Sequence, residues 1–200
     1  QAFLGDNAEP AAPAVNNFSF DNLLTVFGGL RFNFNDNIAL KGIFYYQDYN
    51  ADVWNGTQWV DGDFDSVNAW KVIVDVKQEA LKFTSLWLEY GQMDAGFVTP
   101  TAMGDGGSMF VTTRYEDNHI MWDDLKFFRV GLGQEWNEKW ATHLFYNGYN
   151  FDTKEDLTEW GLGVQYTYNP SVKFGLNYVK IDWDGDTKDD HVLRFRTQVV

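Results

Sequence analysis

The stretch His191-Val-Leu-Arg-Phe-Arg-Thr-Gln-Val-Val200 alternates between apolar and polar side chains along most of its length. Successive residues of a β-strand point to opposite faces of a sheet. One face of this segment therefore carries Leu193, Phe195, Thr197 and Val199. The other face carries Arg194, Arg196 and Gln198. The segment predicts a strand with one side suited to hydrocarbon and one side suited to charge or water.

The same alternation recurs in eight earlier segments, with no competing helical period of 3.6 residues. We expect strands at about 23–34, 38–47, 69–77, 81–92, 126–136, 140–149, 160–168 and 172–178, followed by 191–200. Residues 109–115 are a candidate for one more short strand. The Asn55-Gly56 pair suits a small hairpin inside the connection 48–68. Residues 1–17, which include two prolines, predict a linker or an external loop before the strands of 18–200.

Composition removes several classes of protein and of site. The sequence has no cysteine, so disulfides and thiolate metal sites are excluded. A net charge of -14 disfavours a nucleic-acid partner, because phosphate binding needs a basic surface. The sequence contains no run of 18 apolar residues, so it predicts no transmembrane helix. A membrane β-barrel passes this test, since each of its strands needs only about ten alternating residues.

Three features favour an antiparallel transmembrane β-barrel over a soluble sandwich. Short turns alternate with long connections, as in bacterial outer-membrane barrels. Aromatic residues lie near the ends of the apolar faces, where a membrane interface would hold them. The opposite faces carry charges that are candidates to line a pore: Arg31, Lys41, Lys71, Glu89, Arg129, Glu135, Lys173, Arg194 and Arg196. The alternative is a β-sandwich or jelly roll at the cell surface that binds glycans through exposed tryptophans.

The strand count constrains a barrel further. Single-chain bacterial barrels have an even number of strands, whereas about nine are visible in this sequence. We expect either a missed strand or a larger even-stranded barrel of which these residues form the C-terminal portion.

The hairpin rhythm and the terminal Val-Leu-Arg-Phe-Arg-Thr-Gln-Val-Val strand resemble the C-terminal half of outer-membrane porins. The resemblance covers about 18–200 and extends to the porins that carry an S-layer homology (SLH) domain in diderm, Firmicutes-like bacteria. It implies a trimeric, water-filled barrel in the outer membrane that passes small hydrophilic solutes. Porins usually end on an aromatic residue, whereas this sequence ends on Val199-Val200. A residue 201 would share the outward parity of Val199, so we expect a terminal Phe to be missing.

The charges are distributed unevenly along the chain. The connections 48–68, 93–124, 150–159 and 182–190 hold most of the 29 Asp and Glu residues but few of the 15 Lys and Arg residues. The hypothesis is that arginines of the wall face acids of 93–124 folded inward, which would make a pore selective for ions. The alternative is that these charges balance one another in solvent without affecting permeation.

Two acidic runs are candidates for divalent cations, because carboxylate oxygens suit Ca²⁺ or Mg²⁺. They contribute Asp61, Asp63 and Asp65 in one connection and Asp182, Asp184 and Asp186 in another. Neither completes an EF-hand, and ordinary solvated loops would look the same. Calcium at these loops is a candidate bridge to lipopolysaccharide.

Catalysis has little support in the sequence, and we expect no enzyme and no catalytic residues. The three histidines are scattered, and no nucleophile stands in a recognisable setting. Glu89 and Glu135 are a conceivable carboxylate pair for glycoside hydrolysis, but they fit better as charges of the wall. The expected partners are outer-membrane lipid and lipopolysaccharide, further copies of the chain, and small hydrophilic solutes.

Overall fold

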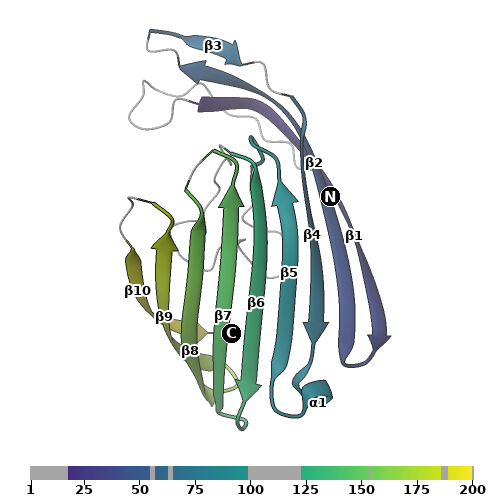
Figure 1. Cartoon of the computed structure of the whole chain (residues 1–200), viewed down its shortest axis with the longest axis vertical. Helices are drawn as coiled ribbons and strands as arrows, with labels where there is room; N and C mark the ends of the chain where they lie inside the picture. Colours follow the sequence, from purple (N-terminus) through teal and green to yellow (C-terminus); the bar gives the residue numbers. More distant parts are fainter. Residues whose placement is uncertain are drawn as a thin grey trace.

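The chain forms one curved antiparallel sheet in the computed structural model (Figure 1). The structure describes residues 18–54, 57–62, 65–98, 123–153, 155–185 and 189–199. Within these ranges the strands are β1 (Phe18–Asn35), β2 (Ile38–Trp54), β3 (Trp59–Gly62), β4 (Val67–Val76), β5 (Ser85–Met93), β6 (Leu125–Glu135), β7 (Trp140–Phe151), β8 (Leu157–Asn169), β9 (Val172–Trp183) and β10 (Asp190–Val199). A single helical turn, α1 (Gln78–Leu81), joins β4 to β5.

Neighbouring strands of the sheet also follow one another in the chain, except that β3 lies between β2 and β4 in the sequence. The order is β1-β2-β4-β5-β6-β7-β8-β9-β10, and the short β3 pairs with the end of β2. Every pairing is antiparallel, with register irregularities in the β1–β2 and β8–β9 pairs. The predicted all-β antiparallel fold is confirmed. A small hairpin does lie inside the connection 48–68, but Trp54 is opposite Trp59, so its turn spans 55–58 and is longer than the expected two-residue turn. Residues 55–56, the segment 1–17 and the candidate strand 109–115 lie outside the described residues.

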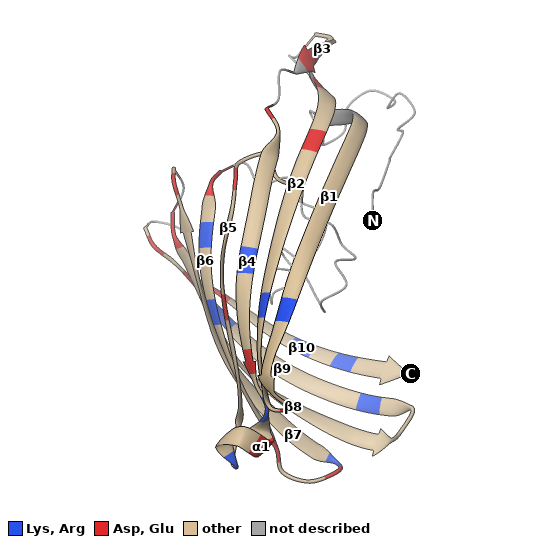
Figure 2. Cartoon of the chain, turned by 90° about the vertical axis from the view of Figure 1, so that its right-hand side faces the viewer, with Lys and Arg blue, Asp and Glu red and all other residues tan. Residues whose placement is uncertain are grey.

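The sheet curls into a trough whose two edges are β1 and β10 (Figures 1 and 2). In the described part of the chain the trough is not closed into a barrel. Eight antiparallel steps separate the two edge strands, so β1 and β10 run in the same direction. These two edges therefore cannot pair with each other in an antiparallel ladder.

Short turns gather at one end of the sheet, and three of them use the same asparagine contact. The side-chain oxygen of Asn35 accepts hydrogen bonds from the backbone N–H groups of Asn37 and Ile38, at 2.8 and 3.0 Å. Asn137 accepts the equivalent pair of bonds from Lys139 and Trp140, and Asn169 accepts one such bond from the N–H of Ser171. An Asn side chain that replaces a backbone acceptor in this way fixes a tight reversal. The predicted turns at 35–37, 137–139 and 169–171 are confirmed.

Long connections gather at the other end, where carboxylates hold the loops to one another. Asp124 Oδ1 accepts the backbone N–H of Ala95 at 2.7 Å, and Asp123 Oδ2 accepts both the N–H and the hydroxyl of Thr153. Asp156 likewise accepts the N–H of Phe151 at 3.0 Å. Figure 2 shows many acidic segments at this end of the strands. Several of these acids therefore act as hydrogen-bond acceptors that shape the loops.

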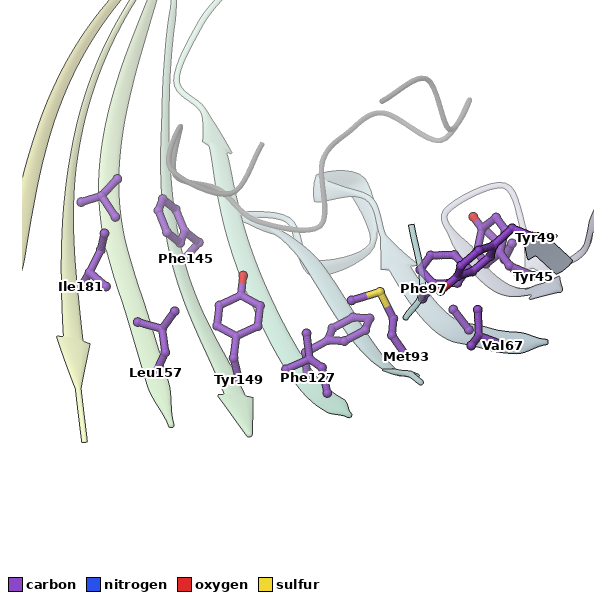
Figure 3. Close-up of a cluster of buried hydrophobic side chains, with 14 of the residues drawn as sticks. Tyr45, Tyr49, Val67, Met93, Phe97, Phe127, Phe145, Tyr149, Leu157 and Ile181 are labelled. Atoms are coloured by element: carbon purple, nitrogen blue, oxygen red, sulfur yellow. The ribbon is translucent and has the colours of Figure 1, made fainter. Parts of the chain in front are cut away.

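The sheet has two faces of different chemistry. The outer face carries large apolar side chains that remain open to solvent, among them Leu30 at 85% and Leu193 at 72% exposure. The inner face is concave and carries the buried side chains (Figure 3). Exposed apolar residues of the outer face come from every strand of the main path: Val26, Leu30, Phe32, Phe44, Val72, Tyr90, Phe128, Leu132, Leu144, Tyr146, Trp160, Leu162, Val164, Leu176, Leu193 and Phe195.

Among the described residues, no helix has the length and apolar character needed to cross a membrane.

Replacing Asn137 by Ala should lower the free energy of unfolding by about 1 kcal/mol, because two backbone N–H groups of the turn lose their acceptor. Glu138→Ala in the same turn is the matched control, and it should change stability by less than about 0.5 kcal/mol. Denaturant unfolding in detergent measures both values. Equal losses for the two variants would contradict the role assigned to the asparagine.

Candidate functional site

The inner face of the sheet holds the nine charged residues predicted to line a pore. Strand register places all of them on this side, although they come from seven strands. Arg31, Glu135 and Arg196 are exposed, and Lys41, Lys173 and Arg194 are half-buried. Lys71, Glu89 and Arg129 are buried. The shared face follows from strand parity, whereas the differences in burial depend on what each side chain contacts.

One row of directly opposed residues crosses the inner face from β1 to β10. We call it the charged row: Arg31, Lys41, Ile73, Glu89, Arg129, Asn147, Glu159, Ile181 and Asp190. It starts near the short-turn end of β1 and finishes at the long-connection end of β10. Such an oblique path is the geometry of a staggered, tilted sheet of the kind that forms barrels.

Glu89 lies between two cations at the centre of this face. Its Oε1 is 3.7 Å from Lys71 Nζ, and its Oε2 is 3.7 Å from Arg129 Nη1. Glu89 is only 2% exposed. The Arg129 guanidinium also lies over the Trp87 ring, 4.9 Å from its centroid. A buried carboxylate needs such compensation, because removing an ion from water costs several kcal/mol.

A second buried polar group follows in the same row. Glu159 is fully buried, and its Oε2 accepts hydrogen bonds from Asn147 Nδ2 at 3.1 Å and from the Tyr149 hydroxyl at 3.3 Å. Asn147 is also fully buried. Strands β7 and β8 therefore present a buried carboxylate with an amide and a phenol as donors.

An apolar cluster occupies the inner face, mostly between this row and the long connections. It was not predicted, because the sequence was expected to place glycines and charges on this face. The cluster draws on β2, β4, β5, β6, β7, β8 and β9 (Figure 3): Ile43, Tyr45, Tyr49, Ala51, Val67, Ala69, Met93, Phe97, Leu125, Phe127, Phe145, Tyr149, Leu157, Val179 and Ile181. The near-continuous apolar runs at strand ends, such as Leu125 with Phe127-Phe128, were the available signal.

Glycines of the inner face make room for these aromatic rings. Gly161 lies directly opposite Phe145, and the Phe145 ring occupies the space where a Cβ of residue 161 would stand. Gly91 and Phe127 make the same kind of pair between β5 and β6. Aromatic rings laid over cross-strand glycines bring close packing to a curved sheet.

The start of the long connection 93–124 also folds onto the inner face. Gln47 Nε2 donates to the Val98 carbonyl at 2.8 Å, and the Val98 N–H donates back to Gln47 Oε1 at 2.8 Å. The Tyr49 hydroxyl lies 2.9 Å from the Gly96 carbonyl. Phe97 is 2% exposed and packs 6.0 Å from the Tyr45 ring. Residues 94–98 therefore attach to β2 across the concave side of the sheet.

The acids proposed for divalent cations are not gathered in the described structure. Asp61, Asp65 and Asp184 are exposed, and Asp63 and Asp186 lie outside the described residues. Asp182 forms an ion pair with Lys180, whose ammonium also lies 3.4 Å from Asp189. In the described part of the chain no three Asp, Glu or His side chains come together as a metal site.

Comparison with known proteins includes two solved structures that align with most of this chain. No protein-family model matches the chain, and neither does any curated protein sequence. The CymD monoaromatic hydrocarbon channel aligns with a TM-score of 0.47 and 10% identity, over 90% of this chain and 50% of its own. The β domain of the Bordetella autotransporter BrkA aligns with a TM-score of 0.41 and 14% identity, over 88% of this chain and 71% of its own. This chain thus spans about half the length of the first.

Replacing Glu89 by Gln should lower the free energy of unfolding by about 3–5 kcal/mol, because Lys71 and Arg129 would stay buried without a counterion. Lys71→Met is the matched variant, and it should cost about 1 kcal/mol or less because Glu89 and Arg129 still compensate each other. Denaturant titration in detergent measures both. A Glu89→Gln loss no larger than the Lys71→Met loss would contradict a central role for this carboxylate.

Proposed function

We propose that the chain forms the wall of a transmembrane β-barrel in a bacterial outer membrane and supports passive diffusion of small hydrophilic solutes or ions. The observation that carries the proposal is the contrast between the two faces of the sheet. Large apolar side chains stand exposed along the outer face, whereas the concave inner face holds buried ionised groups, amides and glycines beside the buried apolar cluster. A soluble sheet normally buries its apolar face against a second layer.

The outer face needs an apolar covering. Soluble monomers rarely expose a continuous apolar surface of more than a few hundred Å². Acyl chains cover such a surface without a second sheet. The soluble sandwich that binds glycans through tryptophans would require a second layer, and all strands of the described residues belong to one sheet.

Aromatic pairs on the outer face fit the two interfaces of a membrane. Toward the long connections, the rings of Trp70 and Tyr90 lie 5.7 Å apart. Toward the short turns, the rings of Trp140 and Tyr166 lie 4.6 Å apart. Between these levels runs an aliphatic row of opposed residues: Val76, Leu86, Leu132, Leu144 and Leu162. Aromatic girdles on either side of an aliphatic band are typical of outer-membrane barrels.

The two ends of the sheet support an orientation. Outer-membrane barrels have short periplasmic turns and longer external loops. We therefore assign the asparagine turns to the periplasmic side and the acidic connections to the cell exterior, where lipopolysaccharide is the neighbouring lipid. Calcium bound between external carboxylates and lipid phosphates is part of this proposal.

The inner face would line a water-filled pore narrowed from one side. The attachment of residues 94–98 to β2 brings the start of the connection 93–124 onto the inner face. The acids expected to fold inward from 99–122 lie outside the described residues. Arg31, Glu135 and Arg196 are then exposed wall charges, in reach of permeating ions. The ion pairs of Glu89 with Lys71 and Arg129 would hold neighbouring strands of the wall together.

Completing the barrel requires strands beyond those described. Since β1 and β10 run in the same direction, an odd number of additional strands must lie between them for every neighbour to be antiparallel. The resemblance to SLH-domain porins adds a homotrimer as the proposed assembly.

Reconstitution into planar bilayers tests the proposal. Detergent-extracted protein should produce stepwise conductance increments, and its β-type circular dichroism should persist in a membrane mimetic. Protein that is monodisperse without detergent and produces no conductance would overturn the proposal.

Replacing Arg194 and Arg196 together by Gln should shift the reversal potential in a salt gradient toward cation selectivity, because two inner-face cations are lost. Lys126→Gln is the matched control, since Lys126 is exposed on the outer face. It should leave selectivity unchanged. Equal behaviour of the double variant and the control would show that the wall charges do not influence permeation.

A further inference from the structure

Three consecutive residues of the charged row carry buried polar atoms that lack a hydrogen-bond partner. These atoms are Glu89 Oε1, Arg129 Nε and Asn147 Oδ1. The residues are 2%, 7% and 0% exposed. Buried polar groups are almost always hydrogen-bonded, and leaving one unpaired is costly. Three such atoms on three adjacent strands therefore indicate a missing partner of defined chemistry.

The register places these three residues side by side between two polar groups. Glu89 is directly opposite Arg129, and Arg129 is directly opposite Asn147. On one side Arg129 Nη1 faces Glu89 Oε2, and on the other Asn147 Nδ2 donates to Glu159 Oε2. The donor Arg129 Nε and the acceptor Asn147 Oδ1 complement each other but form no direct hydrogen bond. A third group that accepts from one and donates to the other would join them.

The charges around this junction exclude simple ions. A metal cation would meet Lys71 and Arg129, which already flank the Glu89 carboxylate. An anion would meet two acceptors, Glu89 Oε1 and Asn147 Oδ1. A hydroxyl group both donates and accepts, so it satisfies Arg129 Nε and Asn147 Oδ1 together, and a neighbouring hydroxyl can donate to Glu89 Oε1.

Aromatic rings flank the junction in the rows on either side. Trp87 lies beneath the Arg129 guanidinium, and Phe127 and Tyr149 are opposed residues of the next row toward the long connections. Phe145 lies in the row toward the short turns, opposite Gly131 and Gly161. Polar side chains that can bind hydroxyl groups therefore lie between rows of aromatic rings. This arrangement suits a molecule that has hydroxyl groups at its edges and C–H groups on its faces.

We propose that Glu89, Arg129 and Asn147 form a subsite for an uncharged polyhydroxylated solute, a sugar or a polyol. The proposal deepens the pore function and rests on it, because the pore is the route by which a solute would reach the inner face. The subsite gives the wall a preference for hydroxyl-bearing neutral solutes, in addition to any preference for ions set by the exposed charges.

Isothermal titration calorimetry of the full chain in detergent micelles, with sucrose and with sorbitol as probes, tests the subsite. Saturable binding is expected for at least one probe. Asn147→Leu removes the bridging acceptor, and Arg129→Lys removes Nε while keeping a cation beside Glu89. Each should weaken binding at least about tenfold, as expected where a site loses a buried hydrogen-bond partner of a hydroxyl.

Gln165→Leu is the matched control, because Gln165 is a half-buried inner-face amide outside the charged row. It should bind as the unaltered protein does. Circular dichroism of each variant establishes that it is folded. No saturable binding of either probe, or equal binding by folded Arg129→Lys and Gln165→Leu, would overturn the subsite.

Measurements of ionic current in planar bilayers distinguish a failure of the subsite proposal from a failure of the pore proposal. If the protein conducts but neither probe binds, the pore stands and the subsite is overturned. If a probe binds with the expected variant pattern but no conductance occurs, the subsite is supported and the pore is contradicted. If both hold, the probe should also reduce the ionic current, and Arg129→Lys should diminish that reduction.

Discussion

The structure depends on one geometric constraint, the two-residue period of the β-strand held in register across the sheet. A slip of one residue in any pairing would exchange the outer and inner faces of every later strand. The register irregularities occur only near the ends of the β1–β2 and β8–β9 pairs. Leu30 of β1 and Leu193 of β10 therefore lie on the same face. This consistency makes the outer face a continuous apolar surface.

On the inner face, charged side chains lie close together and partly out of water. Curvature brings inner side chains together, so the charges here must be compensated or removed. Glu89 is compensated by Lys71 and Arg129, and Glu159 by Asn147 and Tyr149. Nearer the long connections, aromatic rings packed over glycines replace the charges, as Phe127 does over Gly91. The inner face is therefore closely packed near the long connections, and its buried polar groups follow a single oblique row.

Strand identity, turn position and face were predictable from the sequence. Each depends on local information, the alternation of side chains and the turn preference of residues such as Asn137. The contacts of the inner face were not predictable. Glu89 and Arg129 lie on either side of the connection 93–124, so parity gives them a common face but gives no register between β5 and β6. The place of Phe127 in a buried apolar cluster was not predicted either, although its parity directs it inward.

The central claim is that even and odd positions of a strand contact different solvents, lipid outside and water or protein inside. Because the sequence has no cysteine, single cysteines can be introduced and spin-labelled without background. Labels at Leu162→Cys and Val164→Cys should be relaxed mainly by oxygen dissolved in lipid. Labels at Gln165→Cys and Thr167→Cys should be relaxed mainly by a water-soluble nickel chelate. Equal accessibility at all four positions, or the reverse pattern, would contradict a lipid-facing outer surface.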